Sequence, residues 1–191
     1  MGYIVKGTMD KTRRVLFTQD EETMNEIREE ESIADRLCKG ITDYLIRISS
    51  LAINEKEHQH VASLLQIVSD ISDYCENISE YAENLANQKK KFSGVGAAEM
   101  KEMLEVCSDS FTYAVEAFEE NSAEKALKVI EKERSADDLE IRLRADHMQR
   151  LANKQCDTEA GIVFLDALVG LERISDHSRN IAEEVLSASN K

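Results

Sequence analysis

The stretch of residues 64–85 reads LLQIVSDISDYCENISEYAENL and shows the clearest helical pattern of the chain. Its apolar residues recur at steps of three and four positions, which places them on one stripe of an α-helix. The members of this stripe are Leu64, Ile67, Val68, Ile71, Cys75, Ile78, Ala82 and Leu85. The spacing predicts a long amphipathic helix that buries one face. Residues 162–186 show the same period and predict a second helix of this kind.

The composition of the whole chain is also typical of an all-α protein. Its 191 residues include no Pro, no Trp, seven Gly, five Phe and five Tyr. Because a proline inside a helix costs about 3 kcal/mol, a proline-free chain of this length fits long helices. The small numbers of aromatic residues and glycines disfavour a β-sandwich or a β-barrel.

The charge of the chain restricts its partners. The 38 Asp and Glu outnumber the 24 Lys and Arg, so the formal net charge is −14. Nucleic acids and anionic membrane surfaces would repel such a protein, and no segment approaches the ~20 apolar residues of a membrane span. We therefore expect no nucleic acid and no direct lipid insertion, but an affinity for cations.

The cysteines indicate a reducing environment. Cys38, Cys75, Cys107 and Cys156 form no CxxC pair and have no nearby histidine at zinc-ligand spacing. The N-terminus carries no signal peptide pattern. We expect reduced thiols that pack as small apolar residues in a cytoplasmic protein.

The two halves of the sequence repeat each other. Residues 71–80 and 174–183 agree at six of ten positions at an offset of 103, and residues 31–35 match 133–137 at an offset of 102. Each half therefore reads as three helices, and the nearly equal offsets indicate one register.

This repeat predicts the domain boundaries. We expect a first repeat over residues 1–92, a glycine-containing linker over 93–96 and a second repeat over 97–191. The fourth helix is expected near 97–120, and its counterpart in the first half would begin before Met1. The first helix is therefore expected to be shortened, either because the chain is cut from a longer protein or because this helix is naturally short.

Pairs of acidic residues with the spacing ExxxD are the candidate site. Two carboxylates four positions apart on a helix face the same way and repel each other, unless a hard cation lies between them. The pairs at repeat-related places are Glu31/Asp35, Glu133/Asp137 and Glu172/Asp176. The alternative to metal ligation is a polar network between helices. Glu105/Asp109 has no counterpart in the other half and is expected to be solvated surface.

Two sequence blocks carry a family resemblance. Residues 171–183, LERISDHSRNIAE, resemble a characteristic block of the PhoU family. Residues 156–166, CDTEAGIVFLD, are similar to the segment that precedes this block in the PhoU-like C-terminal domain of bacterial sodium/phosphate cotransporter proteins. Both halves fit the resemblance, although the motif in the first half is degenerate.

The resemblance implies a fold and a set of metal ligands. The fold would be two tandem three-helix, spectrin-like bundles related by a pseudo-twofold axis. Family members carry metal clusters, iron among them, on the ExxxD surface. The ligands implied for this chain are Glu31, Asp35, Asp73, Glu133, Asp137, Glu172 and Asp176. Ser69 stands where the first half should have an acidic residue, so its site is expected to be weaker, differently built or empty.

The resemblance also implies a non-enzymatic regulatory domain for phosphate uptake. Our leading expectation is the cytoplasmic domain of a sodium/phosphate cotransporter, tethered to the inner face of the plasma membrane. The alternative is a free-standing PhoU-type regulator of a phosphate ABC transporter and its sensor kinase. The expected partners are the membrane portion of a transporter, or a separate transport protein, and a sensor kinase. Whether the protein forms a homodimer is left open by the sequence. A di-metal oxidase is disfavoured because such enzymes need Glu-x-x-His on two helices, whereas this spacing occurs only at Glu55/His58 and Glu57/His60, which overlap in one short stretch.

Overall fold

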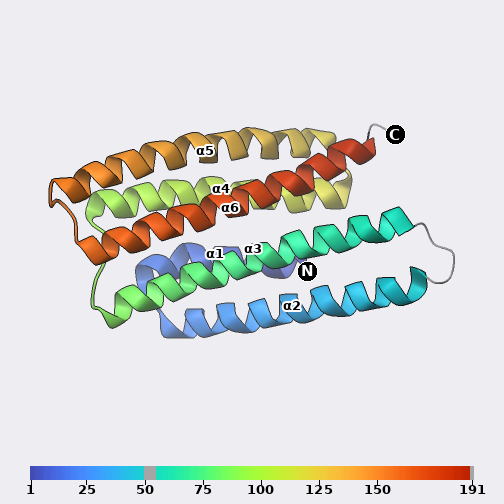
Figure 1. Ribbon diagram of the computed structural model, residues 1–191, viewed down its shortest axis with the longest axis horizontal. Helices are drawn as coiled ribbons and strands as arrows, with labels where there is room; N and C mark the ends of the chain where they lie inside the picture. The colour runs from blue at the N-terminus through green and yellow to red at the C-terminus, as the bar shows by residue number, and fades with distance from the viewer. Residues whose placement is uncertain (50–54, 190–191) are drawn as a thin grey trace.

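The computed structural model describes residues 1–49 and 55–189, which form six α-helices and no strand (Figure 1). The predicted all-α class is therefore confirmed. The helices are α1 (Gly2–Thr18), α2 (Glu21–Ser49), α3 (Glu55–Asn87), α4 (Gly94–Glu120), α5 (Ala123–Ala152) and α6 (Thr158–Ser189). None of the described helices is both long and apolar enough to cross a lipid bilayer.

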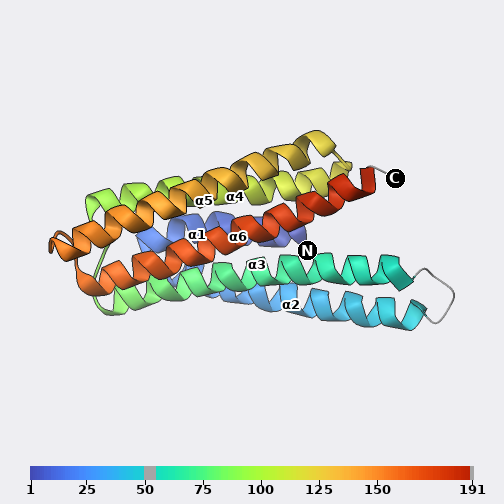
Figure 2. The same cartoon turned by 45° about the horizontal axis from the view of Figure 1, so that its top comes forward.

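The helices form two three-helix bundles that lie side by side, α1–α3 in one and α4–α6 in the other (Figures 1 and 2). The bundles join where α3 packs on α6 and α1 packs on α4. Within the described part of the chain, α2 and α5 contact only helices of their own half. The two outer helices thus present one long face each to solvent.

The predicted apolar stripe of α3 faces the core. Ile71, Cys75, Ile78 and Ala82 are fully buried, and Leu85 is buried at the end of the helix. Cys38 and Cys107 are buried as well, while Cys156 is half-buried, and all four thiols are free. These cysteines therefore pack largely as small apolar residues.

The connection between the two bundles differs from the expected linker. Helix α4 begins at Gly94, so residues 93–96 are the cap and first turn of a helix and not a linker. The Ser93 hydroxyl accepts a hydrogen bond from the Gly96 amide at 3.1 Å, which satisfies one of the free N–H groups of a helix start. The chain instead crosses between the bundles over residues 88–93.

One end of the molecule ties both bundles together. The Gln19 side chain, just after α1, donates to the Lys90 carbonyl at 2.9 Å. The Lys90 ammonium pairs with Asp157 at 2.9 Å and also with Glu159. Asp157 in turn accepts bonds from the Glu159 and Ala160 amides and so caps α6. Ser122 likewise caps the start of α5, where its hydroxyl accepts a hydrogen bond from the Lys125 amide.

Candidate metal centres

The structure brings three of the expected ligands of the first half together. Glu31 and Asp35 lie one turn apart on α2, and Asp73 faces them from α3. One carboxylate oxygen from each of the three lies within 4.8 Å of the other two. We call this group the first cluster.

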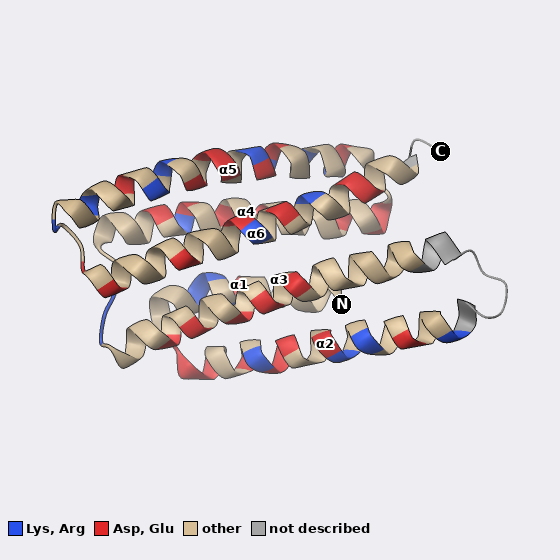
Figure 3. Ribbon diagram, in the orientation of Figure 1, with Lys and Arg blue, Asp and Glu red and all other residues tan. Residues whose placement is uncertain are grey.

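The second half holds an equivalent group at the same repeat positions. Glu133 and Asp137 on α5 meet Asp176 on α6, again with carboxylate oxygens within 4.8 Å of one another. We call this group the second cluster. Acidic residues occur on all six helices, and the red segments along α2, α5 and α6 in Figure 3 show how widely they are spread, so acidity alone does not single out these places. What distinguishes them is that three carboxylates converge from two helices.

The seventh expected ligand, Glu172, lies beside the second cluster but outside the 4.8 Å group. It shares a helical turn with Asp176, and Arg173 lies between them, 3.8 Å from Glu172 and 3.6 Å from Asp176. The equivalent position in the first half is Ser69, whose hydroxyl donates to Asp35 at 2.9 Å. The first cluster is thus built differently, with a hydroxyl where the second has a carboxylate.

Partial burial and, to a smaller extent, neighbouring negative charges raise two pKa values in the first cluster. Partial desolvation, reinforced by Asp35 and other neighbouring carboxylates, raises the pKa of Asp73 to about 6. Desolvation and the charge of Glu76 also raise the pKa of Glu31. The charged forms of Glu31 and Asp73 are therefore less favourable here than in water.

The second cluster contains its own counterion. The Arg179 guanidinium donates to Glu133 Oε1 at 2.8 Å and to Glu183 at 2.8 Å. Glu133 is only 2% exposed, and its other oxygen, Oε2, has no hydrogen-bond partner among the described residues. Desolvation and the carboxylate of Glu133 raise the pKa of Asp137. An unpartnered buried carboxylate oxygen is costly, and a bound cation would satisfy it.

Sequence reasoning did not single out Arg179 or its counterpart Glu76. The two occupy one repeat position, because residues 76 and 179 are 103 apart. Glu76 contributes to the repulsion in the first cluster, whereas Arg179 neutralises charge in the second. The same offset that revealed the repeat would have revealed this exchange of charge.

Three further motif residues lie outside the clusters. His177 packs against the Tyr74 ring of α3, with ring centroids 5.8 Å apart, so it belongs to the contact between the bundles. Asn77 and Asn180 are exposed. The Glu105/Asp109 pair, expected at the surface, lies on α4, where Asp109 pairs with Lys132 at 2.8 Å.

Comparison with known proteins places this architecture in a family. The family described as "PhoU domain" matches residues 1–88 and 100–185, one copy in each bundle. The "Phosphate-specific transport system accessory protein PhoU homolog 1" of Thermotoga maritima is 25% identical over 195 residues, covering 97% of this chain and 81% of that protein.

Solved structures share the fold. PhoU from Pseudomonas aeruginosa superposes with a TM-score of 0.89 at 21% identity, over 100% of this chain and 92% of that one. The phosphate transport system regulatory protein PhoU from Streptococcus pneumoniae gives a TM-score of 0.84 at 18% identity, over 97% and 87%. These likenesses agree with six helices in two repeats, and the family match agrees with a non-enzymatic regulatory protein. The chain belongs to the PhoU family.

Proposed function

We propose that this protein regulates phosphate uptake as a PhoU-type accessory protein of a phosphate transport system, and that its two clusters bind metal ions. One observation carries the metal part: three carboxylates converge at equivalent positions of both repeats, with Glu133 buried and one of its oxygens unpartnered. The regulatory part is supported by the match to a phosphate-specific transport accessory protein over 97% of the chain.

The free-standing regulator is favoured over a cotransporter domain. The relatives that match are named as PhoU regulators and accessory proteins. The block that suggested a cotransporter, residues 156–166, has a structural explanation. Asp157 caps α6, and a Cβ on Gly161 would come within 2.7 Å of Leu151 and 2.9 Å of His147. These residues serve the turn between α5 and α6, so they report on the fold and not on a cotransporter.

The ligand set suits hard cations. Carboxylate oxygens are the donors preferred by Mg²⁺, Ca²⁺, Mn²⁺ and oxidised iron. Each cluster offers three of them from two helices, so a bound ion would also hold α2 to α3 and α5 to α6. A metal ion bound between α2 and α3, or between α5 and α6, would offer its remaining coordination positions to a transport protein or a sensor kinase.

Elemental analysis of protein purified without chelator tests the metal sites. We expect bound metal in the wild type and less in Asp137→Ala/Asp176→Ala. Glu105→Ala/Asp109→Ala is the matched control, because it removes the same charge from an ExxxD pair on α4 that lies outside both clusters. A metal content that is zero in the wild type, or equal in all three proteins, would contradict the proposal.

The regulatory role requires a cellular test. The gene is expressed in a bacterial strain that lacks its own PhoU, and phosphate uptake and a phosphate-starvation reporter are measured at high phosphate. We expect the wild type to lower both. Failure of the wild type, with the protein present and folded, would contradict the regulatory role while leaving the metal sites to the elemental analysis.

A further inference from the structure

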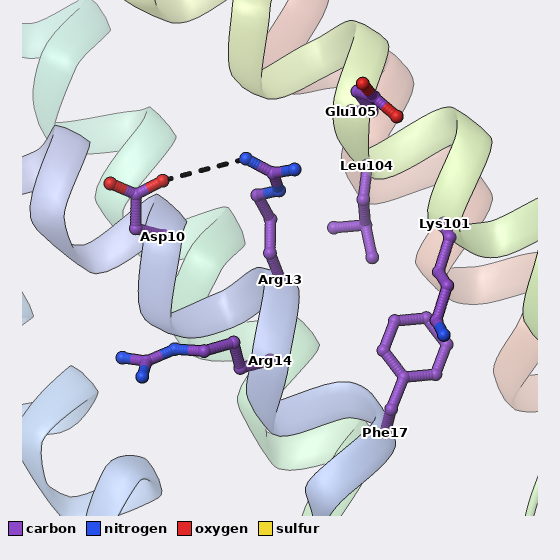
Figure 4. A pocket seen from close by; sticks show the side chains of 7 residues that line it. All are labelled: Asp10, Arg13, Arg14, Phe17, Lys101, Leu104 and Glu105. Atoms are coloured by element: carbon purple, nitrogen blue, oxygen red, sulfur yellow. Dashed lines mark ion pairs between the residues drawn. The ribbon is translucent and has the colours of Figure 1, made fainter.

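A pocket between α1 and α4 lies outside both clusters and has no role in the function proposed above (Figure 4). It has a volume of about 490 Å³, which falls within the ~300–1,000 Å³ of small-molecule sites. Its lining residues are Asp10, Arg13, Arg14, Phe17, Lys101, Leu104 and Glu105. The pocket therefore spans the two halves of the molecule at the α1/α4 contact.

Three basic side chains gather here in a chain of net charge −14. The Arg13 guanidinium extends from α1 toward α4 and comes only within 3.9 Å of Asp10. Among the described residues, no carboxylate oxygen pairs within 4.0 Å with Arg14 or Lys101. By contrast Lys11, on the same helix, pairs with both Glu26 and Glu30 at 2.8 Å. Asp10 and Glu105 also line the pocket, so its three cations face two carboxylates and the lining has a formal net charge of +1.

Two of the seven lining residues, Phe17 and Leu104, give part of the wall an apolar surface. Leu104 is 1% exposed, and Phe17 packs against the core. The Lys101 ammonium lies 5.1 Å from the centre of the Phe17 ring, where a cation–π contact holds it at the mouth (Figure 4). Cations beside an aromatic and an aliphatic surface are suited to a ligand that has both an anionic and an organic part.

The opposite end of the α1/α4 contact is the repeat-related counterpart of this pocket, and its residues can be compared with the pocket lining. At the 102-residue offset, Arg13, Arg14 and Phe17 correspond to Val115, Glu116 and Glu119. There Val115 lies only 3.3 Å from a Cβ built on Gly2, and the Tyr3 hydroxyl donates to Glu119. The residues at that end are apolar or acidic, whereas their counterparts in the pocket are basic or aromatic, so the pocket is not a feature of the repeat.

We propose that this pocket binds a phosphate-bearing organic molecule of nucleotide size. Arg13 and Lys101 would contact the phosphate oxygens, with Arg14 adding positive charge at the rim. Phe17 and Leu104 would pack against the organic part. A single phosphate ion would fill only a small part of the volume, which is why the proposal specifies a larger ligand.

Isothermal titration calorimetry with ATP, AMP and inorganic phosphate tests this proposal. EDTA is present throughout, so that no cation can bridge the ligand to the carboxylate clusters. We expect a nucleotide to bind the wild type and to bind Arg13→Gln/Lys101→Gln at least about tenfold more weakly, as for the loss of a hydrogen bond to a charged group. Added salt should weaken binding to the wild type as well.

The matched control is Lys128→Gln/Arg142→Gln, which removes two exposed cations that do not line the pocket. It should bind nucleotide as the wild type does, and thermal unfolding verifies that both double variants are folded. No nucleotide binding to the wild type, equal binding by both double variants, or tighter binding of inorganic phosphate than of any nucleotide would overturn the proposal.

Discussion

The two carboxylate clusters share a backbone framework but differ in how their charge is balanced. Three repeat positions on the inner helices α3 and α6 carry the difference. They are occupied by Ser69, Asp70 and Glu76 in the first half and by Glu172, Arg173 and Arg179 in the second. At these positions the second half has one carboxylate and two arginines. The first half has two carboxylates and a hydroxyl.

Three equivalent ligands therefore lie in two different electrostatic environments, one in each half of the molecule. Arg179 compensates the buried Glu133 without any metal. In the part of the chain that the structure describes, no cation pairs with a carboxylate of the first cluster, where desolvation and neighbouring carboxylates raise the pKa values of Glu31 and Asp73. We therefore expect the first half to depend more on a bound cation than the second half does.

The largest expected effect comes from replacing the side chain at the repeat position of Glu76 and Arg179 in each half. In the presence of EDTA, Arg179→Met should lower the free energy of unfolding by about 2–4 kcal/mol, because it leaves the buried Glu133 without its partner. Glu76→Met should leave it unchanged or raise it by roughly 0.5 kcal/mol, because it relieves repulsion.

Urea unfolding followed by circular dichroism measures both effects. Opposite signs at one repeat position would support the different charge balance of the clusters. Equal losses of stability in the two variants would show that both side chains act only through packing.

Exchanging the hydroxyl for a carboxylate sharpens the comparison. In a background with the second cluster removed by Asp137→Ala/Asp176→Ala, Ser69→Glu should bind Mn²⁺ about tenfold more tightly, because it adds an oxygen ligand beside Asp35. Ser69→Ala is the control for losing the hydroxyl bond to Asp35. Titration calorimetry measures the affinity, and a Ser69→Glu protein no better than Ser69→Ala would contradict the expectation.

The smallest expected effect is a pH dependence of the metal-free protein. Because the pKa of Asp73 is raised to about 6, the folded state holds this proton more tightly than the unfolded state. The stabilisation from protonated Asp73 is present at low pH and is lost as the pH rises through 6. After allowance for solvent screening the change is about 1 kcal/mol, or about 2–4 °C in Tm.

Melting curves at pH 5 and pH 7 in EDTA measure this effect. His147 acts in the opposite sense, because burial lowers its pKa, so the quantity to compare is the difference between the wild type and Asp73→Asn. The wild type should gain more stability than Asp73→Asn on going from pH 7 to pH 5. An identical pH response in the two proteins would show that Asp73 ionises normally.

Much of the fold could be predicted from the sequence because its signals are local. The apolar stripe over residues 64–85 needs only helical spacing, and the repeated blocks need only an offset. The linker prediction failed at Ser93 because a serine next to glycines suits a loop and a helix start equally. The Ser93 hydroxyl bond to Gly96, which decides between them, requires knowledge of the backbone.

The candidate metal ligands were easier to predict from the sequence than the side chains that surround them. Six of the seven expected ligands lie in the two clusters, because ExxxD spacing and repetition are visible in the sequence. Whether these carboxylates hold metal stays a prediction. The pairing of Arg179 with Glu133 joins residues 46 positions apart, so it depends on how α5 and α6 are packed. No spacing rule within one helix indicates such a contact.

The contact between Arg179 and Glu133 limits which helices could be exchanged between the two bundles. Both it and the Ser69–Asp35 bond join an outer helix to an inner helix of the same bundle. Replacing α2 by a copy of α5 would bring Glu133 without its arginine, whereas replacing α2 and α3 together would preserve the pairing. The interchangeable module of this protein is therefore a helix pair, and chimaeras made with whole pairs should keep their charge balance.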